Sequence, residues 1–198
     1  DFNNIYFDGV DWIVPDKSSC GNDGVFRNGT PETVDVNGVT GLNFDGVDDY
    51  IIFDSTPSLN LTKGSVVVAV KKLENDRLQA IFIKEKAYYF NYQADNKLRA
   101  HLYSGGTAYN TFSSAHITNS DLHLLAWTFN SDVKVYIDGE LDKRGSVPGA
   151  IDTNANPLYL GSYYLTEGRY LNGTVTLARI YNKPLSEEDI RFIQASYP

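Results

Sequence analysis

Two apolar runs joined by a short polar turn decide the fold class of this chain. Residues 124–129 read Leu-Leu-Ala-Trp-Thr-Phe and residues 133–137 read Val-Lys-Val-Tyr-Ile, with Asn-Ser-Asp between them. Asp138-Gly139 follows as a second tight turn, because glycine accepts the positive φ that such turns require. Runs of β-branched and aromatic residues bounded by turn formers are typical of strands. This segment therefore predicts an antiparallel β-hairpin.

The same pattern recurs along the chain, and one segment differs from it. Further strands are expected at residues 65–70, 80–83, 88–92, 97–103, 158–161 and 174–181. A helix is expected at 186–195, since Ser186 can cap it, acidic residues follow at once, and Ile190 and Ile193 share a face. Short strands without a βαβ rhythm indicate an all-β protein with two antiparallel sheets packed face to face. We expect one domain over residues 1–198.

Composition narrows the function classes. The 198 residues carry 17 Lys and Arg against 25 Asp and Glu, a formal charge of −8, which argues against nucleic-acid binding. The longest apolar run, residues 66–70, is far too short for membrane insertion. A single cysteine, Cys20, excludes an internal disulfide. The numbered chain begins at Asp1 without Met or a signal segment, so we expect a piece of a larger protein.

Several blocks of sequence resemble one known family. They are SSCGNDG at 18–24, GLNFDGVDDYI at 41–51, LHLLAWTF at 122–129, VKVYIDGEL at 133–141, LYLG at 158–161, and residues 171–175 and 179–190. In this order they resemble laminin-G-like domains of the concanavalin A-like lectin/glucanase superfamily. The resemblance implies a two-sheet jelly roll. The chain departs from the family pattern at Leu122, where a tryptophan is usual, and at Thr176 and Leu177, where acidic residues are usual.

The glucanase branch of that superfamily makes catalysis the first activity to consider. Retaining glycosidases need two carboxylates about 5 Å apart, and the glucanase branch supplies them from one strand at a spacing of two. No such strand motif is present, and Glu187-Glu188-Asp189 lies at the predicted helix start, where capping and the helix dipole explain it. We therefore expect no enzymatic activity and no catalytic residues.

Acidic loop residues suggest a structural calcium ion. Asp45, Asp48 and Asp49 form the densest acidic cluster, and Asp16 is a further candidate ligand. Ca²⁺ prefers such oxygen ligands, and the family resemblance implies calcium in many members. The alternative is that these residues only form turns and cap a strand.

Tyrosines beside glycines are the candidate ligand-binding residues. Tyr163, Tyr164 and Tyr170 fall in the loop that begins at Gly161, while Tyr103 and Tyr109 flank Gly105-Gly106. Exposed tyrosine rings can stack on sugar rings. The alternative is that they pack in the core or at its rim.

These observations favour a non-catalytic carbohydrate-binding or adhesion module, a lectin-like domain of an extracellular, cell-surface or virion protein. Its expected partner is a glycan or a surface protein. The main alternative is a structural or protein-interaction jelly roll, such as a capsid, tail or surface decoration, without a sugar site. One jelly roll can host either role, so the fold alone does not choose between them.

Overall fold

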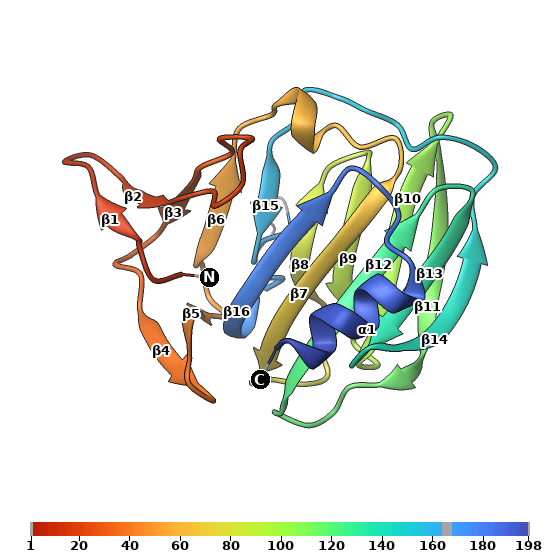
Figure 1. Ribbon diagram of the computed structural model, residues 1–198. Coiled ribbons are helices and arrows are strands. Elements are labelled where there is room, and N and C mark those ends of the chain that lie inside the picture. The colour runs from red at the N-terminus through yellow and green to blue at the C-terminus, as the bar shows by residue number, and fades with distance from the viewer. Residues whose placement is uncertain (1, 164–167, 198) are drawn as a thin grey trace.

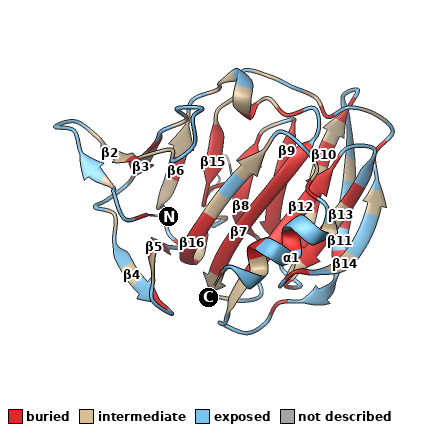
Figure 2. Ribbon diagram, viewed as in Figure 1, coloured by how far each residue is buried: buried red, intermediate tan, exposed pale blue. Residues whose placement is uncertain are grey.

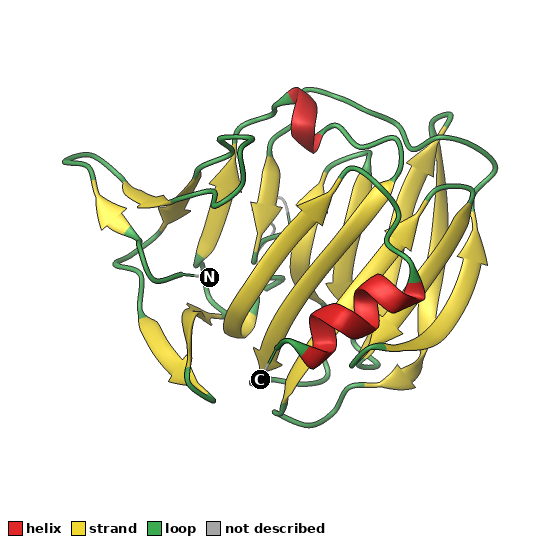
Figure 3. Cartoon of the chain, in the orientation of Figure 1, coloured by secondary structure: helices red, strands yellow, loops and turns green. Residues whose placement is uncertain are grey.

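The computed structural model describes residues 2–163 and 168–197, and it is a sandwich of two antiparallel sheets with one short helix on its surface (Figures 1 and 3). We name the nine-stranded sheet sheet A. In spatial order its strands are β1 (Tyr6–Phe7), β2 (Trp12–Val14), β3 (Gly24–Arg27), β6 (Tyr50–Phe53), β15 (Leu158–Leu160), β8 (Gln79–Lys84), β9 (Tyr88–Tyr92), β10 (Lys97–Ser104) and β11 (Thr107–His116).

The seven-stranded sheet, sheet B, lies in front of sheet A in Figure 1. In spatial order it consists of β14 (Glu140–Ser146), β13 (Asp132–Ile137), β12 (Leu122–Phe129), β7 (Gly64–Lys72), β16 (Asn172–Tyr181), β5 (Val39–Asp45) and β4 (Thr33–Val36). A single 3-10 turn, Pro57–Leu59, follows β6. The predicted all-β, two-sheet architecture is confirmed.

The hairpin predicted from the sequence is present in sheet B as β12 and β13. β12 and β13 pair antiparallel from Phe129↔Val133 to Leu125↔Ile137, and Asp138 and Gly139 both have positive φ in the turn that follows. Trp127 is fully buried between the sheets and stacks on Phe90 of sheet A, with ring centroids 4.8 Å apart. Apolar side chains on both inner faces therefore form one continuous core.

The helix predicted at 186–195 is present as α1 (Glu187–Ala195), and it covers the outer face of sheet B. The Ser186 hydroxyl accepts from the Asp189 N–H (3.0 Å), and the Asp189 carboxylate accepts from the Ser186 N–H (2.8 Å), which completes a capping box. Ile190 and Ile193 are buried against β7, β12, β13 and β16, while the opposite side of α1 is exposed (Figure 2).

Candidate functional site

The outer face of sheet A carries a row of side chains that crosses six neighbouring strands. The strand register aligns Ile52, Tyr159, Ile83, Tyr89, His101 and Asn110 in that order across β6, β15, β8, β9, β10 and β11. Successive residues of a strand alternate between the two faces, so this row points away from the core that holds Tyr88, Phe90 and Leu102. Within residues 2–163 and 168–197, no helix covers this row.

Aromatic rings gather around this row, and we call the group the tyrosine face. Its members are Tyr50, Tyr89, His101, Tyr103, Tyr159 and Tyr163. Tyr89 is central: it stacks on His101 at 4.9 Å and contacts the rings of Tyr103 at 5.9 Å and Tyr163 at 5.6 Å. Tyr50 and Tyr159 extend the group across the sheet, with ring centroids 5.9 Å apart.

The exposure of these rings differs. Tyr89 and Tyr159 are each 5% exposed and form the base of the tyrosine face. Tyr50, Tyr103 and Tyr163 are only partly buried, so part of each ring reaches solvent. The Arg169 guanidinium lies over the Tyr163 ring, 4.8 Å from its centroid, which holds that ring in place by a cation–π contact.

Polar groups border the rings on the β9–β11 side. His101 Nδ1 bonds Asn110 Oδ1 at 2.6 Å, and the Arg99 Nε donates to Asn91 Oδ1 at 3.0 Å. Burial is the main cause that lowers the pKa of His101, so its ring is neutral at pH 7. His101 Nε2 and Arg99 Nη2 are buried and have no hydrogen-bond partner among the described residues. The face therefore combines flat rings with an imidazole nitrogen and a guanidinium N–H at its edge.

The tyrosines that were candidate ligand-binding residues in the sequence lie at different places in the structure. Tyr103 and Tyr163 meet at Tyr89, although 60 residues separate them in the chain. Tyr109 packs against the inter-sheet core, and Tyr170 is 8% exposed with its carbonyl accepting from Arg77. Tyr164 lies outside the described residues.

Four members of the tyrosine face were not identified from the sequence: Tyr50, Tyr89, His101 and Tyr159. Tyr89 carried a usable signal, because it alternates with the core residues Tyr88 and Phe90 and so had to point outward. The position of Tyr159 could not be predicted from the sequence, because β15 pairs with β6 and β8, which are distant in the chain.

The acidic cluster predicted from the sequence is also assembled. Carboxylate oxygens of Asp45, Asp48 and Asp49 lie within 4.8 Å of one another. Asp45 Oδ1 accepts from the backbone N–H groups of residues 47, 48 and 49, at 2.8, 3.2 and 3.3 Å. Burial and then the Asp45 charge raise the pKa of Asp49 to about 6. These bonds are those of a tight turn, yet the remaining oxygens form a hard, anionic donor set that fits Ca²⁺.

Asp16 does not join that cluster. Its carboxylate accepts from the Ser18 N–H (2.8 Å), the Ser18 hydroxyl (2.8 Å) and the Asn22 N–H (2.9 Å) within its own loop.

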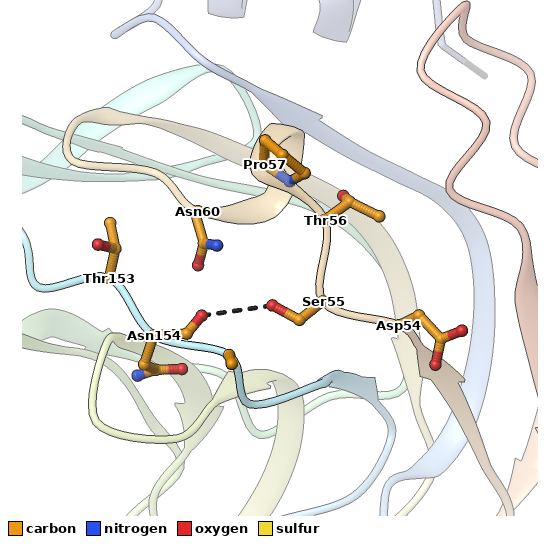
Figure 4. A pocket seen from close by; sticks show the side chains of 8 residues that line it. Asp54, Ser55, Thr56, Pro57, Asn60, Thr153 and Asn154 are labelled. Carbon is orange, nitrogen blue, oxygen red and sulfur yellow. Dashed lines mark hydrogen bonds between the residues drawn. The ribbon is translucent and has the colours of Figure 1, made fainter.

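A hollow lies at one end of the sandwich, between the segment after β6 and the segment before β15 (Figure 4). Its volume is about 730 Å³, and Ser55 donates to the Asn154 carbonyl across it at 3.3 Å. Beneath it the buried Lys84 ammonium donates to the Ser55 hydroxyl and to the Asn156 carbonyl, and burial lowers the pKa of Lys84. The lining consists mainly of hydroxyl and amide groups with the Asp54 carboxylate, and it contains no aromatic ring. We call it the polar pocket.

Two packed antiparallel sheets, a helix on one outer face and aromatic rings on the other define a β-sandwich of the jelly-roll class. Residues 45–191 match the family Laminin_G_3, described as the concanavalin A-like lectin/glucanases superfamily. The chain belongs to this superfamily, and the resemblance noted in the sequence is confirmed. No curated protein matches the chain.

Solved structures with this fold include several binding domains. The binding domain of Paraclostridial Mosquitocidal Protein 1 superposes with a TM-score of 0.75 at 16% identity, covering 93% of this chain and 49% of that one. The botulinum neurotoxin serotype D binding domain gives 0.74 at 14% identity, covering 93% and 49%. Domain 4 of AbnA, an extracellular GH43 arabinanase from Geobacillus stearothermophilus solved with arabinotriose, gives 0.69 at 19% identity, covering 86% and 87%.

The chain thus spans about half the length of the toxin binding domains and most of the arabinanase domain. At these identities the likeness establishes the fold. No helix among the described residues has the length and apolar character to cross a bilayer.

Proposed function

We propose that this domain is a non-catalytic carbohydrate-binding module and that the tyrosine face is its binding site. One observation carries the proposal: Tyr103 and Tyr163 present half-buried rings on an outer sheet face that no described helix covers. The buried ring of Tyr89 contacts both of them from below. A preformed, rigid aromatic surface loses little conformational entropy when a flat ligand binds.

The chemistry of the face suits a sugar. The C–H face of a pyranose or furanose ring stacks on aromatic rings, and its hydroxyls need donors and acceptors at the rim. His101 Nε2 and Arg99 Nη2, an acceptor and a donor without protein partners, lie beside the rings, and both atoms must become exposed for a sugar hydroxyl to reach them. The arabinotriose named with the similar arabinanase domain makes arabino-oligosaccharides the first probe to use.

We propose a non-catalytic role because the tyrosine face lacks the acidic residues that glycosidases use. None of its six residues is a carboxylate, whereas a retaining glycosidase places two carboxyl groups on either side of the bond it cleaves. We place the domain in an extracellular, cell-surface or virion protein as an adhesion or lectin-like module, in keeping with the extracellular arabinanase that shares its fold. Its proposed partner is a glycan, free or on a surface protein.

The decisive experiment is a glycan array followed by titration of the best ligand. Tyr103→Ala and Tyr163→Ala should each weaken binding about tenfold, since a stacked ring contributes about 1–1.5 kcal/mol. Tyr181→Ala is the matched control, because Tyr181 is also half-buried but packs on sheet B. Binding that survives both tyrosine changes and is lost with Thr153→Ala would move the site to the polar pocket. Binding to no glycan would leave the structural or protein-interaction jelly roll as the better account.

We also propose that Asp45, Asp48 and Asp49 bind one Ca²⁺ that stabilises the β5–β6 turn. Without the ion, the native state binds more protons than the unfolded chain between about pH 4 and pH 6, because the pKa of Asp49 is about 6 rather than about 3.9. Stability should therefore fall as pH rises through this window, and Asp49→Asn should remove the fall.

Bound Ca²⁺ favours the ionised carboxylates. Added Ca²⁺ should raise the melting temperature above pH 6 and have little effect near pH 4. An unchanged melting curve across Ca²⁺ and chelator at pH 7 would reduce the three residues to turn formers.

A further inference from the structure

The two lateral edges of the sandwich differ in how far their strand backbones are covered. At one edge β14 approaches β11 so closely that a side chain at Gly145 would collide with Thr111. The Asp142 carboxylate there accepts from the backbone N–H groups of Ser114 (2.5 Å) and Ala115 (3.0 Å). Unpaired strand edges invite association with other chains, and these contacts block that edge.

Toward the opposite edge of sheet B, which ends in β5 and β4, part of β16 is open. β5 pairs with β16 only from Asn172↔Asp45 to Val175↔Leu42, and Figure 1 shows β5 beside the lower end of β16 alone. From Leu177 to Tyr181, β16 pairs with β7 on one side. On its other side no strand of the described chain pairs with these residues. The backbone there offers a row of hydrogen-bonding groups to an added strand.

A cleft of about 580 Å³ runs beside this free edge, with the loop at residues 16–22 as its other lip. Phe53, Leu158 and Leu160 of sheet A form an apolar wall. Ala178 and Ile180, every second residue of β16, face this wall from sheet B and remain partly exposed. An extended peptide on the free edge would place alternate side chains in the cleft.

The charges around the cleft are mainly positive, in a chain whose formal charge is −8. Lys17 and Arg179 line it and are exposed. Asp16 is the one carboxylate among the lining residues, and Ser18 and Asn22 already engage both of its oxygens. A partner with acidic side chains is therefore favoured over a basic one.

We propose that residues 177–181 of β16 bind an extended peptide segment of another protein by β-strand addition, with alternate apolar side chains in the cleft and acidic side chains toward Lys17 and Arg179. This site lies between the sheets and is separate from the tyrosine face. It does not depend on the proposed sugar binding.

The test uses a fluorescein-labelled hexapeptide of alternating Val and Glu, titrated by fluorescence anisotropy. We expect saturable binding that falls at least tenfold when alternate backbone amides of the peptide are N-methylated, because strand addition requires their N–H groups. A Val/Lys peptide should bind more weakly than the Val/Glu peptide. Lys17→Glu and Arg179→Glu should each weaken binding of the acidic peptide, whereas Lys63→Glu, an exposed change outside the cleft, should not.

A second pair of variants tests the cleft directly. Ala178→Leu fills it and should abolish binding, while Ala155→Leu makes the same change at an exposed position in the polar pocket and should leave binding intact. Thermal melting would confirm that both variants fold. Absence of binding, equal binding of the N-methylated peptide, or equal binding by Ala178→Leu would overturn the proposal. A dimer of the free protein that Ala178→Leu dissociates would also overturn it, since a second copy would then occupy the edge.

Discussion

The outer faces of the two sheets differ in the kind of apolar side chain that they carry and in what covers it. On sheet B, Val67, Ala69, Leu124 and Ala126 form an aliphatic patch, and α1 covers it with Ile190 and Ile193. On sheet A the corresponding patch is aromatic, edged by His101 and Arg99, and no described helix lies on it. Aliphatic surface of that size is stable only when buried, whereas tyrosine and histidine tolerate water. The face under the helix is therefore the structural one, and the tyrosine face is the one that we propose for binding.

The largest expected effect lies under the helix. Ile190→Ala should lower the free energy of unfolding by about 3 kcal/mol, because Ile190 is fully buried between α1 and sheet B. Phe192→Ala is the matched control on the same helix: Phe192 is 74% exposed, so its loss should change stability by less than about 0.5 kcal/mol. Urea denaturation measures both.

The same denaturation series separates the two faces. Tyr103→Ala and Tyr163→Ala should cost about 1 kcal/mol or less, since these rings are only partly buried. Losses as large as that of Ile190→Ala would show that the tyrosine face is core, and the comparison between the faces would fail.

A smaller effect comes from the start of the helix. Ser186→Ala removes the hydroxyl that accepts from the Asp189 N–H and should lower the free energy of unfolding by about 1 kcal/mol. Glu188→Ala, an exposed change in the same turn, should cost only a few tenths. Equal losses for the two variants would mean that the capping box contributes nothing beyond helix charge.

The sequence predicted the helix-covered face better than the proposed binding face. The helix at 186–195 is a local feature, and its cap, its charges and its apolar positions are neighbours in the chain. The hairpin around residues 130–132 is local in the same sense. The tyrosine face is not local: Tyr50, Tyr89, Tyr103 and Tyr159 meet only through strand pairings, and the pairing of β15 with β6 joins residues more than a hundred positions apart.

The loops also combine local features that the sequence predicts with tertiary features that it does not. Asp45, Asp48 and Asp49 are adjacent in the chain, so their proximity could be predicted, whereas the burial that raises the pKa of Asp49 could not. The strands before residue 54 and the strands β11 and β14 were not predicted individually, because short or polar runs carry little period-2 signal. The free edge of β16 also had no signal, since it depends on where β5 stops pairing.

The smallest expected effect is a difference in pH dependence between two histidines. Burial lowers the pKa of His101 on sheet A, while the hydrogen bond to Asp138 (2.7 Å) raises the pKa of His123 on sheet B. Below about pH 6.5 the His101 ring binds protons more readily in the unfolded chain than in the native state. Its contribution to the free energy of unfolding therefore rises as pH rises. His123 contributes stability below about pH 6.5 that is lost as pH rises through its raised pKa.

Chemical denaturation between pH 5 and pH 8 checks these signs. His101→Gln should remove the rise at low pH, and His123→Gln should remove the loss at high pH. Slopes that change in the same direction for both variants would contradict the different surroundings assigned to the two rings.

The most direct test of the central claim is an NMR titration of the ¹⁵N-labelled domain with the best glycan from the array. We expect shift changes for backbone amides at Tyr89, His101, Tyr103 and Tyr163, with none at Ile190 and Ile193 of α1. Changes confined to the polar pocket, to sheet B or to α1 would contradict the claim that the tyrosine face binds carbohydrate.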